Sequence, residues 1–412
     1  MINNTQKTSV KWQEETIGNL CEIINGKTPL RSNNEFWENG DVPWFTIDDQ
    51  RKQGRIISKT NQFITKLALE KSGIKLVPKD SVLLCCTASV GEYAITKIPI
   101  TTNQQYNALV IKNKEQIIPE YLFQHTGMIT EKLKSIMGKT TFGFVSVGTL
   151  GSIKIKYPNI GIQQKIATIL SSIDEAIQKT YQIIEKTEKL KNGLMTELLT
   201  KGIGHTKFKK TKIGEIPESW KVSTLSDVCD VRDGTHESPK YIDKGYPLIT
   251  SKNLTEYGLD FSDIKYISEA DYKNISKRSG VNIGDILFGM IGTIGKPIII
   301  DTNIEFSIKN VALIKFFPKS EVDNRFILHY LKSNLIAKQF AKMQDGSTQK
   351  FVSLGTIRNL SILVPNIEEQ KIISNIIDQI EVKINSEVLQ KMNLLKLKKS
   401  LMTDIFSQKL NI

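Results

Sequence analysis

The sequence contains few of the residues that build disulfide frameworks or structural metal sites. It has four cysteines and four histidines among 412 residues. Cys85 and Cys86 are adjacent, whereas Cys21 and Cys229 lie far from them and from each other, so no Cys-x-x-Cys pair exists. The histidines also lack the mutual spacing of metal ligands. These absences predict a reduced protein without a structural metal ion.

Long apolar segments are missing as well. No stretch approaches 18 uninterrupted apolar residues, which argues against a membrane span. The first fifteen residues are polar and lack the apolar region of a signal peptide. We therefore expect a cytoplasmic protein that has no membrane partner.

The motifs of several enzyme classes are absent. Gly295-Lys296 is followed by proline, and Gly138-Lys-Thr140 has Leu133 where a P-loop requires its first glycine. No two prolines are adjacent, which excludes the Asn/Asp-Pro-Pro-aromatic motif of amino-group DNA methyltransferases. The pair Asp48-Asp49 near Lys52 resembles a nuclease cluster, but the corresponding part of the second half of the chain reads Lys252-Asn253. The sequence thus predicts a binding protein that is not an enzyme.

The charge balance indicates the class of partner. The formal net charge is +13 and the isoelectric point is near 9.3. A surplus of basic residues favours a polyanionic partner, with nucleic acid ahead of an anionic membrane surface.

The chain repeats itself with an offset of about 205 residues. Ile17–Gly26 matches Leu225–Gly234, Pro43-Trp-Phe-Thr46 matches Pro247-Leu-Ile-Thr250, and Phe144-Val-Ser146 matches Phe351-Val-Ser353. Further pairs follow in the same order, among them Gln164-Lys-Ile166 with Gln370-Lys-Ile372. Because the order is kept and the offset varies by only a few residues, we interpret the chain as a tandem duplication.

Each repeat combines a globular part with a long helix. The globular parts contain short apolar runs separated by Gly, Pro, Asn and Asp, together with short helical stretches, so we predict a mixed α/β fold (α+β). Ile162–Thr200 and Glu368–Ser407 carry apolar residues at heptad-like spacing and follow prolines, which predicts two long helices. The predicted apolar stripes are Ile162, Ile166, Ile169, Ile173, Ala176, Ile183, Leu190 and Leu194 in the first helix, and Ile373, Ile377, Ile380, Ile384, Val388, Met392, Leu395 and Leu401-Met402 in the second. These helices would pair as an antiparallel coiled coil between the globules, or each would cover its own globule.

A lysine-rich segment, Lys201–Lys212, joins the two repeats. It is interpreted either as a solvated linker or as a segment that faces phosphates. Two similar globules held by paired helices form a pseudo-twofold arrangement. On DNA such an arrangement would recognise two different half-sites at a set spacing, which is an asymmetric, bipartite, gapped target.

The residues resemble the specificity (S) subunit of type I restriction–modification systems over nearly the whole chain. The marks of the second repeat are Asp233-Gly-Thr-His236, Pro239, Tyr241, Gly245, Pro247, Gly346-Ser-Thr-Gln-Lys350, and Val364-Pro365 with Glu369-Gln370-Lys-Ile372. Those of the first are Gly26-Lys-Thr-Pro29, Trp44, Gly138-Lys-Thr140, and Tyr157-Pro158 with Gln164-Lys-Ile166.

The resemblance implies a domain order and a set of partners. It implies target recognition domains at residues 1–157 and 220–364, spacer helices at 158–203 and 365–412, and a basic linker at 204–219. The expected partners are double-stranded DNA, two modification (methyltransferase) subunits and restriction (translocase and nuclease) subunits. The chain itself would hold no cofactor, because S-adenosylmethionine, ATP and magnesium are expected only on the partner subunits.

Polar and basic residues in glycine-containing loops are the candidates for DNA contact, since they can reach phosphates and base edges. In the first repeat they are Thr28, Arg31, Thr46, Arg51, Lys139 and Thr140. In the second they are Thr235, His236, Lys240, Lys252, Asn253, Ser347, Gln349 and Lys350. Ser89 and Thr293 are further candidates, and Trp12 and Trp220 are interpreted as structural anchors. Polar residues of the helices are candidate contacts for modification subunits: Gln163, Lys165, Glu175, Glu369 and Glu381.

Three other interpretations remain open at this point. The chain could be the specificity subunit of a type IIB system, whose partner fuses nuclease and methyltransferase. It could also be a non-catalytic coiled-coil adaptor with protein partners only, or a complete methyltransferase with an unusual motif.

Overall fold

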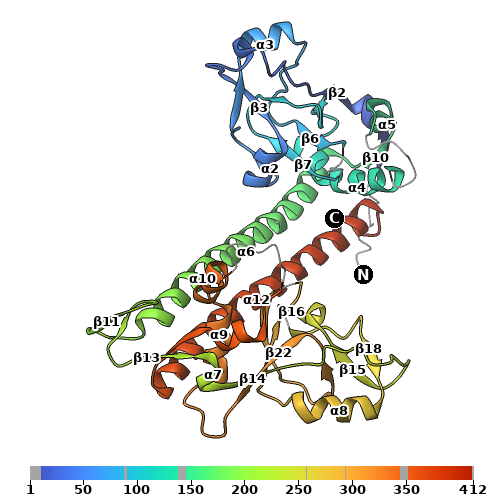
Figure 1. Cartoon of the computed structure of the whole chain (residues 1–412). Helices are drawn as coiled ribbons and strands as arrows, with labels where there is room; N and C mark the ends of the chain where they lie inside the picture. Colours follow the sequence, from blue (N-terminus) through green and yellow to red (C-terminus); the bar gives the residue numbers. More distant parts are fainter. Residues whose placement is uncertain are drawn as a thin grey trace, which may run out of the picture. The chain divides into compact units, whose positions relative to one another are not determined.

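The computed structural model describes residues 11–87, 91–137, 145–256, 258–292, 294–343 and 351–410 (Figure 1). The chain divides into two units: unit 1 comprises Met1–Thr180 and Gln390–Ile412, and unit 2 comprises Tyr181–Leu389. Each unit therefore contains one globular domain and one segment from each of the two long helices. Among the described residues, no helix combines the length and the apolar character needed to cross a membrane.

The domain of unit 1 is built on two main sheets. The larger has the order β2-β9-β6-β7-β4 and the smaller the order β5-β3-β8, while β1 pairs with β10. The strands are β1 (Gln13–Thr16), β2 (Cys21–Asn25), β3 (Val42–Phe45), β4 (Ile56–Ile57), β5 (Gln62–Ile64), β6 (Val82–Cys85), β7 (Tyr93–Thr96), β8 (Thr101–Thr102), β9 (Tyr106–Ile111) and β10 (Lys154–Tyr157). The helices are α1 (Ile17–Leu20), η1 (Asn34–Phe36), α2 (Ile47–Gln53), α3 (Lys66–Lys71), α4 (Pro119–Met137) and α5 (Val147–Gly151).

The domain of unit 2 repeats this topology, with four described strands rather than five in its larger sheet. Its sheets have the orders β14-β22-β19-β20 and β18-β15-β21, and β13 pairs with β23. The strands are β11 (Phe208–Thr211), β12 (Gly214–Pro217), β13 (Lys221–Thr224), β14 (Cys229–Asp233), β15 (Tyr246–Ile249), β16 (Leu254–Thr255), β17 (Gly258–Leu259), β18 (Lys265–Ile267), β19 (Ile286–Gly289), β20 (Gly295–Ile299), β21 (Ser307–Ile308), β22 (Val311–Phe316) and β23 (Ser361–Val364). The helices are α7 (Leu225–Val228), η2 (Ser251–Asn253), α8 (Glu269–Ser279), α9 (Asn324–Lys332), α10 (Asn334–Met343) and α11 (Leu354–Arg358).

The shared strand order confirms the tandem duplication and the mixed α/β fold. In both domains the middle strand of the smaller sheet pairs antiparallel with one neighbour and parallel with the other. The parallel pairing brings distant segments together, because it places Phe45 beside Thr102 and Ile249 beside Ile308. The smaller sheet therefore joins early and late parts of each domain.

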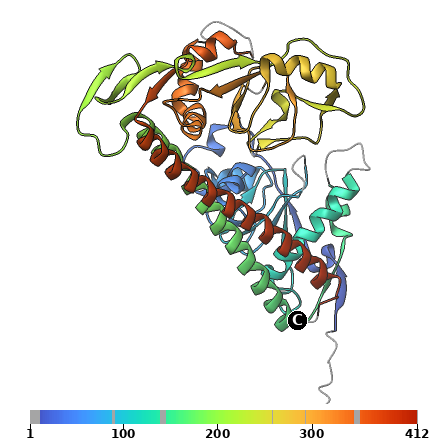
Figure 2. The same cartoon turned by 90° about the horizontal axis from the view of Figure 1, so that it is seen from below.

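The two predicted long helices are present, as α6 (Ile160–Lys201) and α12 (Ile367–Phe406). Segments of α6 and α12 lie side by side (Figures 1 and 2). Lys398 of α12 forms an ion pair with Asp174 of α6 at 2.6 Å in unit 1, and Glu381 of α12 forms one with Lys191 of α6 at 3.4 Å in unit 2. The two contacts show that α6 and α12 run in opposite directions.

The burial of the long helices combines the two predicted arrangements. Ile166 and Leu170 of α6 and Phe406 of α12 join the apolar core of the unit 1 domain. Ile373 and Ile377 of α12 join the core of unit 2. Each domain thus packs on the beginning of its own helix and on the end of the other long helix.

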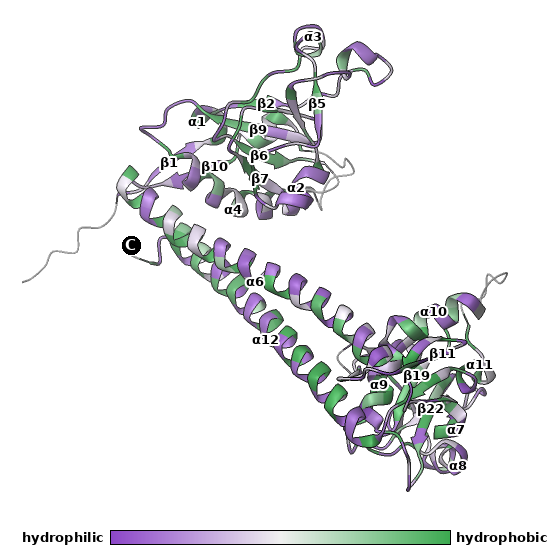
Figure 3. Cartoon of the chain, turned by 90° about the vertical axis from the view of Figure 1, so that its left-hand side faces the viewer, coloured by the Kyte–Doolittle hydropathy of each residue, from purple (hydrophilic) through white to green (hydrophobic). Residues whose placement is uncertain are grey.

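The predicted apolar stripe was wrong at several positions. Ile169, Ile183 and Leu190 of α6 and Met392 and Leu395 of α12 are exposed, although the heptad pattern assigned them to the seam. Ile184, which the heptad pattern left out of the seam, is buried, whereas Ile384 was predicted to be buried and is. Figure 3 shows apolar (green) and polar (purple) residues alternating along both long helices. The predicted stripe was wrong because the buried face changes along each helix, from the globular core to the partner helix.

The segment between the repeats forms a β-hairpin rather than an irregular linker. β11 pairs with β12 in antiparallel register from Phe208 with Pro217 to Thr211 with Gly214. Lys209 and Lys210 are exposed on this hairpin. Its base is fixed to α12, because Glu369 accepts hydrogen bonds from the backbone N–H of Ile203 at 3.0 Å and from the Trp220 indole at 3.1 Å.

Candidate nucleic-acid interface

A glutamine side chain attaches each domain to its long helix in the same way. In unit 1, Gln163 Oε1 accepts from the backbone N–H of Ile118 at 3.0 Å, and Nε2 donates to the carbonyls of Gln116 and Pro158 at 2.9 and 2.8 Å. In unit 2, Gln370 accepts from Asp323 and donates to Glu321 and Pro365 at 2.8, 2.8 and 2.9 Å. The structural equivalent of Gln370 is therefore Gln163, one residue before the Gln164 of the sequence alignment.

Two of the five candidate contacts for modification subunits are internal. Gln163 is fully buried, and Glu369 is 7% exposed. Both side chains hold backbone groups of their own unit, so neither is offered to a partner. Lys165 and Glu175 lie exposed on α6, and Glu381 is half-exposed on α12.

The equivalent residues Thr46 and Thr250 each begin a short helix with the same capping arrangement. Asp49 Oδ2 accepts from the backbone N–H of Thr46 at 2.9 Å, and Asn253 Oδ1 accepts from that of Thr250 at 3.0 Å. Asp49 is fully buried, and its other oxygen accepts from the backbone N–H of Asn61 at 2.8 Å. The capping role accounts for the carboxylate that had resembled part of a nuclease cluster.

The second domain contains a basic hollow of about 380 Å³. It is lined by Tyr241, Leu248, Thr250, Ser251, Lys252, Lys265, Ile291, Lys309 and Asn310. Lys252 Nζ pairs with Asp263 at 2.7 Å, and Lys265 Nζ lies 4.4 Å from the centre of the Tyr241 ring. Three lysines beside an aromatic ring form a surface suited to a polyanion with flat groups.

The first domain places an arginine over two aromatic rings at the corresponding place. The Arg31 guanidinium lies 3.7 Å from the centre of the Trp37 ring and 4.6 Å from that of Trp44. It also donates to Gln62 Oε1 at 2.9 Å. Trp44 pairs with Gln62 in the strand register of the first domain, and Leu248 pairs with Lys265 in that of the second. Gln62 and Lys265 are therefore equivalent positions, one with a neutral amide and the other with a positively charged amine.

A side-chain contact at the rim recurs in both domains. The Thr28 hydroxyl donates to Gln104 Oε1 in unit 1. In unit 2, His236 Nδ1 lies 2.9 Å from Asn310 Oδ1, and Nε2 lies 2.7 Å from Asp233 Oδ2. Hydrogen bonds to Asn310 and then to Asp233 raise the pKa of His236, against a smaller opposing effect of burial. The second domain thus has a titratable group where the first has a hydroxyl.

The predicted DNA-contact residues fall into three groups. Those at least partly exposed are Thr28, Arg31, Thr46, Arg51, Thr235, His236, Lys240 and Lys252. Asn253 is buried, and its amide donates to the carbonyls of Asp260 and Asp263 at 3.1 Å each. Lys139, Thr140, Ser347, Gln349 and Lys350 lie outside the described residues, as do Ser89 and Thr293.

Several residues of this surface were not predicted from the sequence. Lys265 comes from β18, and Lys309 and Asn310 come from the turn between β21 and β22. They reach the hollow only through the pairing of β15 with both of its neighbours. No local sequence motif identifies these three residues as part of the surface. Only their alignment with the first repeat could have suggested it.

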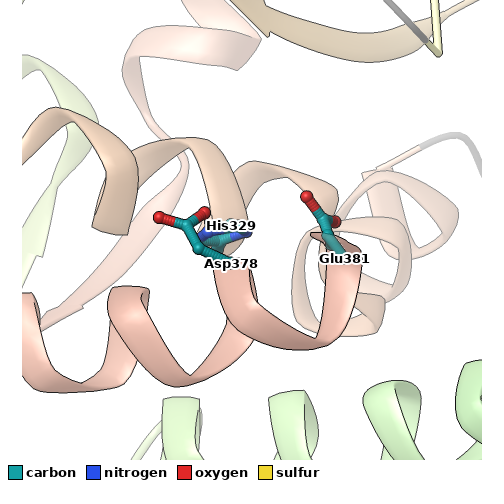
Figure 4. Close-up of side chains that lie close together, drawn as sticks. All are labelled: His329, Asp378 and Glu381. Atoms are coloured by element: carbon teal, nitrogen blue, oxygen red, sulfur yellow. Dashed lines mark hydrogen bonds and ion pairs between the residues drawn. The ribbon is translucent and has the colours of Figure 1, made fainter. Parts of the chain in front are cut away.

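His329, Asp378 and Glu381 lie close together in unit 2 (Figure 4). One ligand atom from each lies within 4.8 Å of the others, which is a spacing that a metal ion could use. However, Asp378 already pairs with His329 at 2.8 Å and with Arg325 at 2.6 Å, and Glu381 pairs with Lys191 at 3.4 Å. The hydrogen bond from His329 and then that from Arg325 lower the pKa of Asp378, against an opposing effect of burial. The cluster is therefore an ion-pair network that joins α9, α6 and α12.

The four cysteines are free and buried. Burial raises the pKa of the Cys21 and Cys229 thiols to about 12. A thiol with such a high pKa is a poor nucleophile at neutral pH, so these side chains serve as packing groups.

Comparison with known proteins adds a family to this geometry. The family described as type I restriction modification DNA specificity domain matches residues 9–189 and 217–396. The type I restriction enzyme MjaIX specificity subunit of Methanocaldococcus jannaschii is 28% identical over 86% of this chain and 83% of its own length. The MjaVIII specificity subunit of the same organism is 27% identical over 97% of this chain and 93% of its own.

A solved structure has the same fold. The S subunit of a type I restriction–modification system from M. genitalium matches with a TM-score of 0.59 at 14% identity, over 98% of each chain. The similarity therefore extends over both domains and both long helices.

Proposed function

The chain belongs to the family defined by the type I restriction modification DNA specificity domain, and on that premise we propose that it chooses the DNA target of such a system. The proposed target is an asymmetric, bipartite, gapped site in double-stranded DNA. Each domain reads one half-site, and the chain itself catalyses no reaction. We place the recognition domains at residues 1–157 and 220–364, the spacer helices at 158–203 and 365–412, and the linker at 204–219.

The observation that carries the proposal is the difference between two copies of one scaffold. The strands common to both domains have the same order and the helix attachment is the same, whereas exposed positions differ. Gln62 of the first corresponds to Lys265 of the second, and Thr28 corresponds to His236. Two binding surfaces with different hydrogen-bonding groups are what two unlike half-sites require.

Basic and polar residues at these surfaces are the proposed DNA contacts. Arg31 and Arg51 in the first domain, and Lys240, Lys252 and Lys265 in the second, are exposed or line the hollow. The net charge of +13 supports the same partner. Because phosphate contacts release counterions, binding should weaken steeply as salt increases. We keep Asn253 in a supporting role, since its side chain has internal partners.

Exposed apolar residues on the long helices are the proposed docking surface for two modification subunits. Leu190 is 56% exposed on α6, and Val382 and Leu389 are 68% and 59% exposed on α12. Large apolar side chains at such exposure on a helix are typical of a protein interface. On this proposal, S-adenosylmethionine, ATP and magnesium act on the modification and restriction subunits, and the complex works in the cytoplasm.

The first test is to purify the tagged chain from its native cells and to identify the proteins that accompany it by mass. We expect a methyltransferase at about two copies per chain, together with a restriction subunit. A single partner that fuses nuclease and methyltransferase would instead indicate a type IIB system. Recovery of the chain without any methyltransferase would contradict the proposal and favour an adaptor.

The second test selects bound duplexes from a random pool with the full chain. The proposal predicts two conserved blocks separated by a gap of constant length. Variants that exchange exposed residues of one domain should alter one block only. Bound DNA without a common sequence would overturn the proposal, and binding of S-adenosylmethionine by the chain alone would indicate a complete methyltransferase.

A further inference from the structure

His236 in unit 2 has an acceptor facing each of its ring nitrogens. Nε2 lies 2.7 Å from a carboxylate oxygen of Asp233, and Nδ1 lies 2.9 Å from the amide oxygen of Asn310. A neutral imidazole carries only one N–H, so with the amide oxygen of Asn310 facing Nδ1 both contacts are hydrogen bonds only when the ring is protonated on both nitrogens. This orientation of Asn310 favours the imidazolium form.

The carboxylate in this contact is held firmly. Asp233 is 5% exposed, at the end of β14, and its other oxygen accepts from Arg278 of α8. The Arg278 carbonyl in turn accepts from Arg232 at 3.0 Å. Because Asp233 cannot turn away without losing Arg278, it presents a fixed negative charge to the imidazole.

The contact joins two segments at the rim of the basic hollow. The segment after β14 is also bound to the turn before β22 by the backbone N–H of Thr235, which donates to Ile308 at 3.0 Å, and by Lys309, whose Nζ donates to Ser238. Asn310 itself lines the hollow together with Lys252. Loss of the His236 contact would therefore release a segment at the edge of the proposed DNA surface.

The first domain makes the same junction without a titratable group. There the hydroxyl of Thr28 donates to Gln104, and neither side chain changes its charge near neutral pH. The two domains consequently differ in one physical property: the junction of the second domain requires a proton from solution.

We propose that Asp233, His236 and Asn310 form a proton-dependent latch that positions the DNA-reading segment of the second domain, so that recognition of one half-site alone depends on pH. Asp233 and His236 act here as positioning residues. The DNA part of this inference rests on the proposed function, whereas the latch itself does not.

The direction of the pH effect follows from the charges around His236. The hydrogen bond with Asn310 and then that with Asp233 raise its pKa above 6.5, and Arg278 opposes them through its charge. The pKa of His236 is higher when its contacts with Asp233 and Asn310 are formed than when they are broken. The contacts therefore stabilise the segment fully below about pH 6.5, and this stabilisation is lost as the pH rises through the higher of the two pKa values. DNA recognition by the second domain should weaken over the same interval.

The latch can be tested without DNA by following the imidazole signals of the full chain by NMR. Only four histidines are present, and His236→Thr identifies the signal of His236 by its disappearance. We expect a pKa above 6.5 with two ring N–H groups below it, and Asp233→Asn should lower that pKa. The His205 signal, which reports a contact with Glu369, should not respond to Asp233→Asn.

A His236 pKa at or below 6.5 would overturn the latch, because it would mean that Asn310 presents its NH₂ group to a neutral ring. A His236 pKa that ignores Asp233→Asn would overturn it as well. Since the signals of His205 and the other histidines report whether the variant is folded, misfolding can be told apart from either result.

The role in recognition is tested with a duplex selected by the full chain at low pH. Between about pH 6 and about pH 8.5, Kd of the unaltered chain should rise about threefold, because the His236 side chain is 58% exposed and solvent weakens its pairing with Asp233. His236→Thr, which copies the hydroxyl of the first domain, should give the same Kd at both pH values. Thr28→Val is the matched control and should weaken binding equally at both.

The outcomes separate the latch from the proposed function. A pH effect that persists when the half-site of the second domain is scrambled would overturn the assignment to that half-site. If His236 titrates as expected but sequence-specific DNA binding does not change with pH, the latch has no role in recognition. Absence of any sequence preference would contradict the proposed function, while the NMR result would still decide the latch.

Discussion

The two domains agree in their interiors and differ on their surfaces. Gln163 and Gln370 make the same three hydrogen bonds, and Asp49 and Asn253 cap their short helices in the same way. At the rim, however, Thr28 corresponds to His236. After duplication, buried polar groups had to keep their partners, because an unsatisfied buried group costs about 1–3 kcal/mol. Exposed positions were under no such constraint and could acquire different binding preferences.

The largest expected difference between the units concerns their equivalent tryptophans. Trp220 is 1% exposed, and its indole donates to Glu369 at 3.1 Å, whereas Trp12 is only half-buried. Trp220→Ala should destabilise unit 2 by about 4 kcal/mol, and Trp12→Ala should destabilise unit 1 by about half as much. Urea unfolding followed by far-UV circular dichroism measures both. Trp220→Phe, which retains a ring but loses the N–H, should lie between the original chain and Trp220→Ala. Equal shifts for the two alanine variants would refute the difference in burial.

The attachment of each domain to its helix gives the next largest effect. Gln163→Ala and Gln370→Ala each remove three hydrogen bonds to backbone groups, so each should cost about 3 kcal/mol in its own unit. Gln164→Ala, at an exposed neighbouring position, should change stability by less than about 0.5 kcal/mol. The same unfolding experiment applies. A large loss for Gln164→Ala with none for Gln163→Ala would restore the register of the sequence alignment and contradict the structural one.

The ion pairs between α6 and α12 should differ in strength between the units. Lys398 is 6% exposed and contacts both oxygens of Asp174 at 2.6 Å, whereas Lys191 is 22% exposed and lies 3.4 Å from Glu381. Lys398→Ala should cost about 2 kcal/mol and Lys191→Ala about 0.5 kcal/mol, since solvent weakens the more exposed pair. A double-mutant cycle for each pair isolates the coupling energy. A weaker coupling for Asp174 with Lys398 than for Lys191 with Glu381 would reverse the comparison.

Much of the fold could be predicted from the sequence because it depends on local patterns. The duplication, the mixed α/β domains and the two long helices followed from repeated residues, turn residues and the absence of proline. The helix boundaries differed by one or two residues from the structure. The apolar stripe failed at Ile183 and Met392 because a regular heptad assumes one partner along the whole helix, whereas these helices change partners.

The candidate site was less predictable, because it is assembled from segments far apart in the sequence. His236 and Lys252 lie near recognisable glycine and capping motifs and could be selected as candidates. Lys265 and Lys309 could not, since only the pairing of β15 with β18 and β21 brings them to the hollow. Glu369 was misassigned to a partner surface because a polar residue near the start of an amphipathic helix gives no sign that an indole and a backbone N–H will bury it.

The smallest expected effect tests one exposed difference between the domains directly. Lys265 and Gln62 occupy equivalent places in the strand registers, and only the lysine can neutralise a phosphate. Lys265→Gln should weaken binding of the selected duplex about threefold and reduce the slope of log K against log salt by about one. Gln62→Lys is the reciprocal variant and should increase that slope by a similar amount. Fluorescence anisotropy over a range of salt concentrations measures both. An unchanged slope for Lys265→Gln would mean that the lysine contacts no phosphate, and its contact with Tyr241 would then be a structural feature of the hollow.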